Sequence, residues 1–97
     1  LNPKQIEVLS LLLYHYNRLS KEITNEKIVW KEVFDYDTKI LISDELKIQM
    51  QSLENLLSQL RKKNVIIDNK ITPYFIPKIN KKTENFKLTF NFKILHE

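Results

Sequence analysis

The sequence predicts a small α+β fold in which helices come first and an antiparallel β-hairpin follows. Apolar residues recur about every 3.6 positions, the helical period, as far as Asn64, and at every second position, the strand period, after it. The chain has 97 residues, of which 42% are hydrophobic and 29% charged, the size and composition of one globular domain. We therefore expect residues 1–97 to form a single domain with a three-helix core.

The first helix is expected to begin at Pro3 and to end between Arg18 and Glu22. Asn2 is a favourable N-cap, proline suits the first helical position, and Gln5 stands where a capping-box partner reaches back. Apolar residues at helical spacing predict that this helix is buried on one side; they are Ile6, Val8, Leu9, Leu12, Leu13, Tyr16 and Leu19.

Residues 20–37 admit either a short helix or a short strand around the apolar cluster that ends at Phe34. Asp35 and Asp37 are expected to act as caps rather than as a catalytic pair, and Asp37 or Thr38 begins a short second helix over 38–46. Aromatic residues of these segments are expected to build the core and the seam between the first helix and the hairpin; they are Tyr14, Tyr16, Trp30 and Phe34.

The third helix is predicted over 51–63, where four leucines form a buried stripe: Leu53, Leu56, Leu57 and Leu60. A tight turn without glycine, Lys47–Met50, precedes this helix. Asn64 follows it and takes the left-handed position that glycine usually holds, since asparagine tolerates positive φ better than most residues.

Two strands are predicted after a short apolar run at Val65–Ile67. The first covers 71–79, where two prolines confine it to a sheet edge. The second covers 86–94, with Phe90 inward and Lys87 outward, and the polar residues 80–85 form the hairpin loop.

Several classes of protein are excluded by residues that the chain lacks. It contains no cysteine, hence no disulfide or thiolate metal site, and no glycine, hence no glycine-rich phosphate loop. His15 and His96 have no neighbours at metal-ligand spacing, and no Ser-His-Asp order occurs. We therefore expect no enzyme activity, no metal and no cofactor. The longest apolar run, Leu11–Tyr14, is too short to span a membrane.

Charge is distributed unevenly along the chain. Residues 1–50 carry 7 basic and 8 acidic side chains, whereas residues 51–97 carry 9 basic and 4 acidic ones, which together give the net charge of +4. A pI near 9.3 with the positive charge in one half favours an acidic partner, nucleic acid first, although lysines also simply solvate small domains.

The absence of glycine and alanine and the 14 lysines against 2 arginines indicate a genome of low GC content: a bacterium, phage or parasite. Because the chain begins with Leu1, we expect a processed or excised piece of a longer protein.

The order of elements resembles that of a winged helix-turn-helix domain. The resemblance lies in "TKILISDELKIQMQSLENLLSQLRKKNVII", residues 38–67, where the apolar spacing, the small Ser43 and the exit "LRKKNVI" match the family pattern. Lys47 and Asn64 stand where the family usually has glycine. The resemblance implies a helix-turn-helix over about 38–63 and a wing over about 65–94.

The resemblance also implies binding to double-stranded DNA, by a transcriptional regulator or by a replication or phage-encoded module. The expected recognition-helix contacts are Gln49, Gln51, Ser52, Asn55, Ser58, Arg61 and Lys62. The expected phosphate contacts, mostly on the wing, are Lys63, Lys78, Lys81, Lys82 and Lys87. Glu54 is expected to weaken phosphate attraction, and the same residues also fit an ordinary solvated surface.

A different function stays open, because winged helices also serve as protein-docking or assembly modules, for instance in a phage or a larger complex. An exposed aromatic patch on the first helix, Tyr14 with His15, would favour a homodimer. The expected location is the cytoplasm, or the virion or host cytoplasm for a phage protein.

Overall fold

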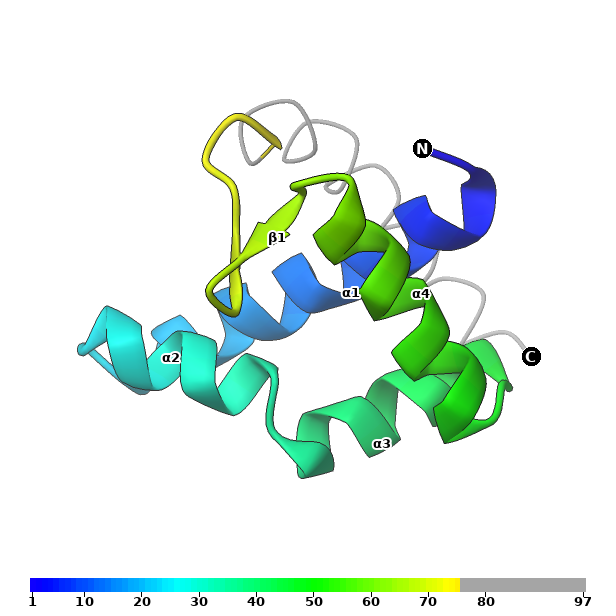
Figure 1. Cartoon of the computed structure of the whole chain (residues 1–97). Helices are drawn as coiled ribbons and strands as arrows, with labels where there is room; N and C mark the ends of the chain where they lie inside the picture. Colours follow the sequence, from blue (N-terminus) through cyan, green and yellow to red (C-terminus); the bar gives the residue numbers. More distant parts are fainter. Residues whose placement is uncertain (76–97) are drawn as a thin grey trace.

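Four helices and a two-stranded hairpin follow one another in the part of the chain that the structure, a computed structural model, describes: residues 1–75. They are α1 (Pro3–Ser20), α2 (Glu26–Val33), α3 (Tyr36–Leu46), α4 (Met50–Lys62), β1 (Ile66–Ile67) and β2 (Lys70–Ile71) (Figure 1). The α+β class is confirmed, whereas the expected three-helix core is wrong, because residues 26–33 form a further helix. The predicted loop over 80–85 and strand over 86–94 lie outside the described residues.

Side-chain caps determine where three of the helices begin. The capping box of α1 is confirmed: the Gln5 N–H donates to Asn2 Oδ1 at 2.9 Å, and the Asn2 N–H donates to Gln5 Oε1 at 3.0 Å. Asn25 caps α2 by accepting from two backbone N–H groups, which explains why the ambiguous segment is helical. Asp35 acts as a cap, as expected, and accepts the N–H of Tyr36; the predicted start of the next helix at Asp37 or Thr38 is wrong, because α3 begins at Tyr36.

Two helices end in the same hydrogen-bonded turn, with a left-handed residue where glycine is usual. After α3, Lys47 has a φ of 56°, its N–H donates to the Asp44 carbonyl, and the next N–H donates to Ser43. After α4, Asn64 has a φ of 59° and the same pair of bonds. Both are Schellman motifs, so the asparagine prediction is confirmed and the lysine adopts a conformation that a Cβ disfavours.

The core is organised around α1, which packs against α2, α3 and α4 (Figure 1). Residues on several sides of this helix are buried: Val8, Leu9, Ser10, Leu11, Leu12, Leu13 and His15. The predicted burial on one side is therefore too narrow. Leu53, Leu57 and Leu60 of α4 are fully buried as predicted, while Leu56 is half-buried against the same core.

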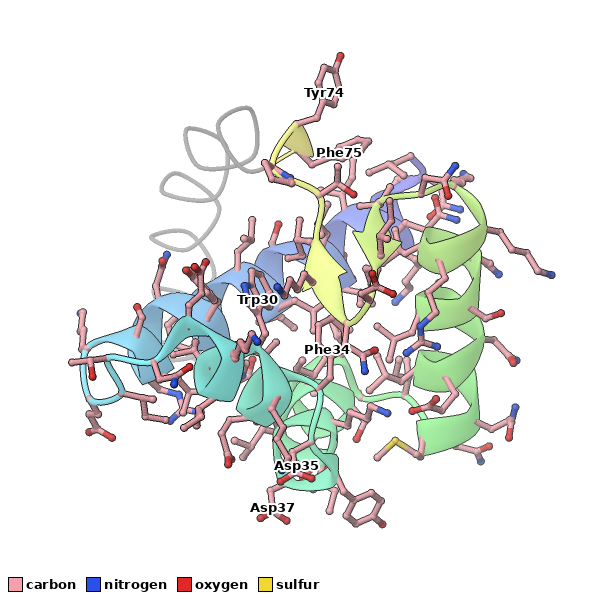
Figure 2. All side chains as sticks on the ribbon, turned by 60° about the vertical axis from the view of Figure 1, so that its left-hand side comes forward. Trp30, Phe34, Asp35, Asp37, Tyr74 and Phe75 are labelled. Carbon is pink, nitrogen blue, oxygen red and sulfur yellow. The ribbon has the colours of Figure 1, made fainter. Side chains whose placement is uncertain are left out.

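Aromatic residues join α1 to α2. Tyr16 stacks on Trp30 with ring centroids 4.3 Å apart, and Phe34 lies 6.3 Å beyond Trp30. The predicted place in the core is confirmed for Trp30 and Phe34, which are buried, and Tyr16 packs against that core. Tyr14 is half-buried and is not part of the core. Figure 2 shows Trp30 and Phe34 on the side of α2 that faces the hairpin.

A short hairpin that the sequence analysis did not predict follows α4, and the predicted pairing of 71–79 with 86–94 involves residues outside the described part of the chain. Ile66 pairs with Ile71 and Ile67 with Lys70, and the connection consists of Asp68 and Asn69 at φ 52° and 54°. Positive φ at both central residues is the requirement of a type I′ turn, which matches the twist of paired strands. The predicted strand over 71–79 is wrong at 72–75: Pro73 cannot donate to a ladder, and the Phe75 N–H bonds back to Thr72 at 2.9 Å. Residues 76–79 of that strand lie outside the described residues.

Candidate functional site

The α3–turn–α4 segment presents one face of α4 to solvent. Ile42 of α3 and Leu53 of α4 are buried in the common core, and Leu46 and Ile48 pack at its edge, as the apolar spacing predicts. Ser43 is buried and its hydroxyl donates to the Ile40 carbonyl at 2.9 Å, which accounts for a small residue at this position. The two helices are thereby held together, and the opposite side of α4 stays accessible.

An amide pair occupies the first half of the exposed face of α4. Gln51 Nε2 donates to Asn55 Oδ1 at 3.1 Å, and both residues are exposed, whereas Ser58 further along is half-buried. The bond leaves Gln51 Oε1 and Asn55 Nδ2 as the acceptor and donor that a ligand would meet. Two side chains four residues apart on a helix are thus held as one polar unit.

The negative charge of Glu54 is matched by α3. Lys39 Nζ lies 2.9 Å from Glu54 Oε1, with the lysine side chain only 20% exposed. The expectation that Glu54 repels phosphate is therefore revised, because its charge is neutralised beside the amide pair. The face of α4 is polar without a net negative charge at this point.

The C-terminal end of α4 is basic, but its three cations differ. Arg61 and Lys62 are exposed in the last turn. Lys63 Nζ instead donates to Gln5 Oε1 at 3.0 Å, and Gln5 Nε2 donates to Gln59 Oε1 at 2.8 Å. Lys63 therefore joins α4 to the start of α1, and its predicted role as a free phosphate ligand is less favoured by this geometry.

The N-terminal end of α4 carries the remaining helix candidates, Gln49 and Ser52. Gln49 is the N-cap but makes no side-chain capping bond, and no acidic side chain occupies the first turn. Ser52 is exposed. The backbone N–H groups here are open to water or to an anion, as at any uncapped helix start.

His15 does not form the exposed patch expected on the first helix. Its side chain is only 2% exposed, its Nδ1 accepts from Arg18 Nε at 3.2 Å, and the Tyr14 ring meets it edge-on at 5.1 Å. Burial, with Arg18 as a second cause, lowers the pKa of His15 to about 4. His15 is therefore not available for a dimer contact, because its ring is buried, while a homodimer through the first helix stays a prediction.

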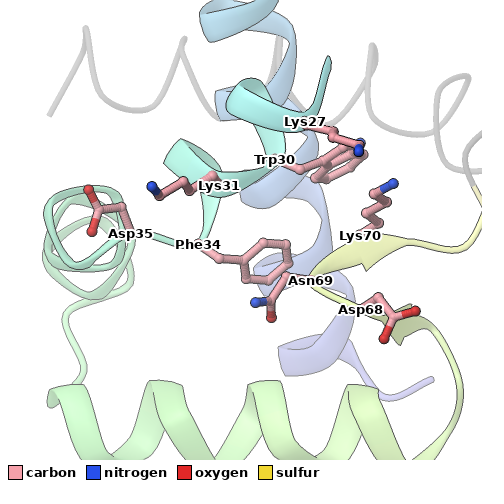
Figure 3. A pocket seen from close by; sticks show the side chains of 8 residues that line it. All are labelled: Lys27, Trp30, Lys31, Phe34, Asp35, Asp68, Asn69 and Lys70. Atoms are coloured by element: carbon pink, nitrogen blue, oxygen red, sulfur yellow. The ribbon is translucent and has the colours of Figure 1, made fainter. Parts of the chain in front are cut away.

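The sequence reasoning missed a pocket of about 420 Å³ between α2 and the hairpin (Figure 3). It is lined by Lys27, Trp30, Lys31, Phe34, Asp35, Asp68, Asn69 and Lys70. Two features of the sequence could have indicated this pocket. Asn25 is a favourable N-cap, and a helix that starts there places Lys27 and Lys31 on the same face. Asp68-Asn69 is a pair typical of a two-residue hairpin turn.

Residues 78, 81, 82 and 87, the predicted wing lysines, lie outside the described residues, so their role stays a prediction. Within residues 1–75, no three His, Asp or Glu side chains gather where a metal ion could be held. No helix in that range combines the length and the apolar character needed to cross a bilayer. No protein-family model, curated protein or solved structure matches the chain.

Proposed function

We propose that the protein binds double-stranded DNA as a winged helix-turn-helix, with α4 entering the major groove. The observation that carries the proposal is the exposed amide pair Gln51–Asn55 on α4. The neighbouring Glu54 is paired with Lys39 of α3, so its negative charge is balanced beside the amides. Amide side chains pair with the N6 and N7 edge of adenine in the major groove. A buried leucine stripe behind the pair keeps the helix rigid while this face docks.

Phosphate contacts in this proposal come from the ends of the docking helix and from the wing. Arg61 and Lys62 are exposed at the C-terminal end of α4, and Lys81 and Lys82 would contribute from the wing. Such contacts position the protein on the duplex without reading its sequence. Amide side chains that contact bases, together with basic side chains that contact phosphates, suit a regulator of transcription. They equally suit a replication or phage-encoded module that acts in the cytoplasm.

A second candidate function is docking of another protein through the same domain. Exposed apolar residues favour it: Leu41 on α3 is 45% exposed and Ile67 on the hairpin is 48% exposed. Such residues occur at protein interfaces, although single exposed apolar side chains are also common on ordinary surfaces.

The test is a titration of labelled duplexes by fluorescence anisotropy at low salt, after selection of preferred sites from a randomised library. Asn55→Ala should weaken binding to the selected site by roughly 1–3 kcal/mol and leave binding to other duplexes nearly unchanged. Lys62→Ala, the matched control on the same helix, should weaken all duplexes alike. Absence of any duplex binding up to about 100 μM, the weak end of non-specific association, would favour protein docking instead.

A further inference from the structure

We propose that the pocket between α2 and the hairpin is a phosphate-binding site for the DNA backbone, separate from the docking face of α4. This inference rests on the proposed function and extends it, since none of the pocket residues was expected to take part. Its basis is a pocket lined by three lysines from two elements, Lys27 and Lys31 from α2 and Lys70 from β2. Figure 3 shows the ammonium groups of Lys27 and Lys70 on the same side of the pocket, while Lys31 extends toward Asp35.

The three lysines have no acidic partner in the described part of the chain. All three are exposed, and none of their ammonium groups makes a hydrogen bond or an ion pair there. Two carboxylates line the same pocket, but Asp35 accepts the Tyr36 N–H as the cap of α3, and Asp68 belongs to the hairpin turn. The lining therefore carries three cations against two carboxylates, which leaves one positive charge in excess to attract an anion from outside.

The spacing on α2 also favours an external anion. Lys27 and Lys31 are four residues apart in a helix of eight residues, a spacing at which like charges weaken a helix, although their ammonium groups extend to different sides in Figure 3. Glu26, the acidic residue in the first turn, instead accepts the Tyr16 hydroxyl at 3.1 Å. A bound phosphate would offset the remaining repulsion between the lysines of the pocket.

The wall of the pocket favours the sugar–phosphate backbone over a stacked base. Trp30 is 4% exposed and already stacked on Tyr16, so its face is not open to a base. Phe34 is similarly covered, and Asn69 adds an amide that can donate to a phosphate oxygen. A volume of about 420 Å³ accommodates a phosphate with its sugar.

The position of the pocket is compatible with a duplex that also contacts α4. The hairpin lies between α2 and α4 in both views, and β1 packs directly against α4 (Figures 1 and 2). A backbone that leaves the docking face and follows the hairpin thus reaches Lys70 and then α2. The pocket would add contacts that carry charge without sequence information.

The test compares two double variants of the whole chain that remove equal charge. The pocket variant, Lys27→Gln with Lys31→Gln, removes both positive charges on the α2 side of the pocket. The control variant, Lys4→Gln with Lys21→Gln, removes two exposed lysines that do not line the pocket. Thermal unfolding verifies that both variants fold. We expect the pocket variant to bind every duplex more weakly and to lower the slope of log K against log salt by about two, while the control keeps the slope.

Three outcomes would overturn the inference. If the unaltered protein binds duplexes but both variants have its slope, the pocket is not a DNA contact and only this inference fails. If the unaltered protein binds no duplex, the proposed function fails with it. If polyglutamate or inorganic phosphate binds in a manner that the pocket variant abolishes, while duplex binding is unchanged, the pocket serves another anion.

Discussion

Acid should destabilise the protein through His15. The pKa of His15 is about 4 in the folded protein and 6.5, the ordinary histidine value, in the unfolded chain, so the unfolded chain takes up a proton over a range of pH in which the buried ring does not. Stability contributed by the neutral ring is therefore complete above pH 6.5 and is lost as the pH falls toward 4. One decade in proton affinity is about 1.4 kcal/mol, which gives a loss of about 2 kcal/mol near pH 5 and about 3 kcal/mol near pH 4.

Urea unfolding followed by circular dichroism at about pH 7 and about pH 5 measures this loss. His15→Gln removes the titrating ring while retaining an acceptor for Arg18, so its free energy of unfolding should fall by about 2 kcal/mol less over the same interval. Burial raises the pKa of the Glu45 carboxyl, against the opposing effect of the nearby Arg18 charge. The folded protein therefore protonates Glu45 more readily than the unfolded chain, so Glu45 raises the free energy of unfolding as the pH falls, opposite to His15. Repeating the comparison with Glu45→Gln in both proteins separates the two groups. Equal pH dependence with and without His15 would refute the reasoning.

Three further predictions concern the core, a turn and the wing. Leu57→Ala should lower the free energy of unfolding by about 2–5 kcal/mol in a denaturant titration, because Leu57 is fully buried in the α4 stripe, and an unchanged midpoint would mean that the stripe is misplaced. Lys47→Gly should raise stability by up to about 1 kcal/mol, since glycine adopts φ 56° without a Cβ penalty, and a lower thermal midpoint would contradict this. Lys81→Ala with Lys82→Ala should lower the salt slope of duplex binding by about two without changing sequence preference, and an unaltered slope would remove the wing from the proposed interface.

Features whose signals lie within one or two turns of chain could be predicted from the sequence. The capping box at Asn2 and Gln5, the leucine stripe of α4 and the left-handed Asn64 depend on residues at most a few positions apart. The exposed amides of the candidate DNA-binding face follow from the same period, because the residues opposite a buried stripe point outward. The boundaries of the elements were harder to predict, because a single capping residue determines them: Asp35 caps α3, so this helix begins at Tyr36 rather than at residue 38.

The tertiary structure alone decided the features that join distant segments. The ion pair that balances the charge of Glu54 requires Lys39 from another helix, the bond that restrains Lys63 requires Gln5 near the N-terminus, and the pocket requires Lys70 opposite α2. The burial of His15 likewise depends on the neighbours that surround α1, not on its own spacing. Local propensity acts over a few residues, whereas charge pairing and burial depend on distance in space, which only the packing of the helices and hairpin determines.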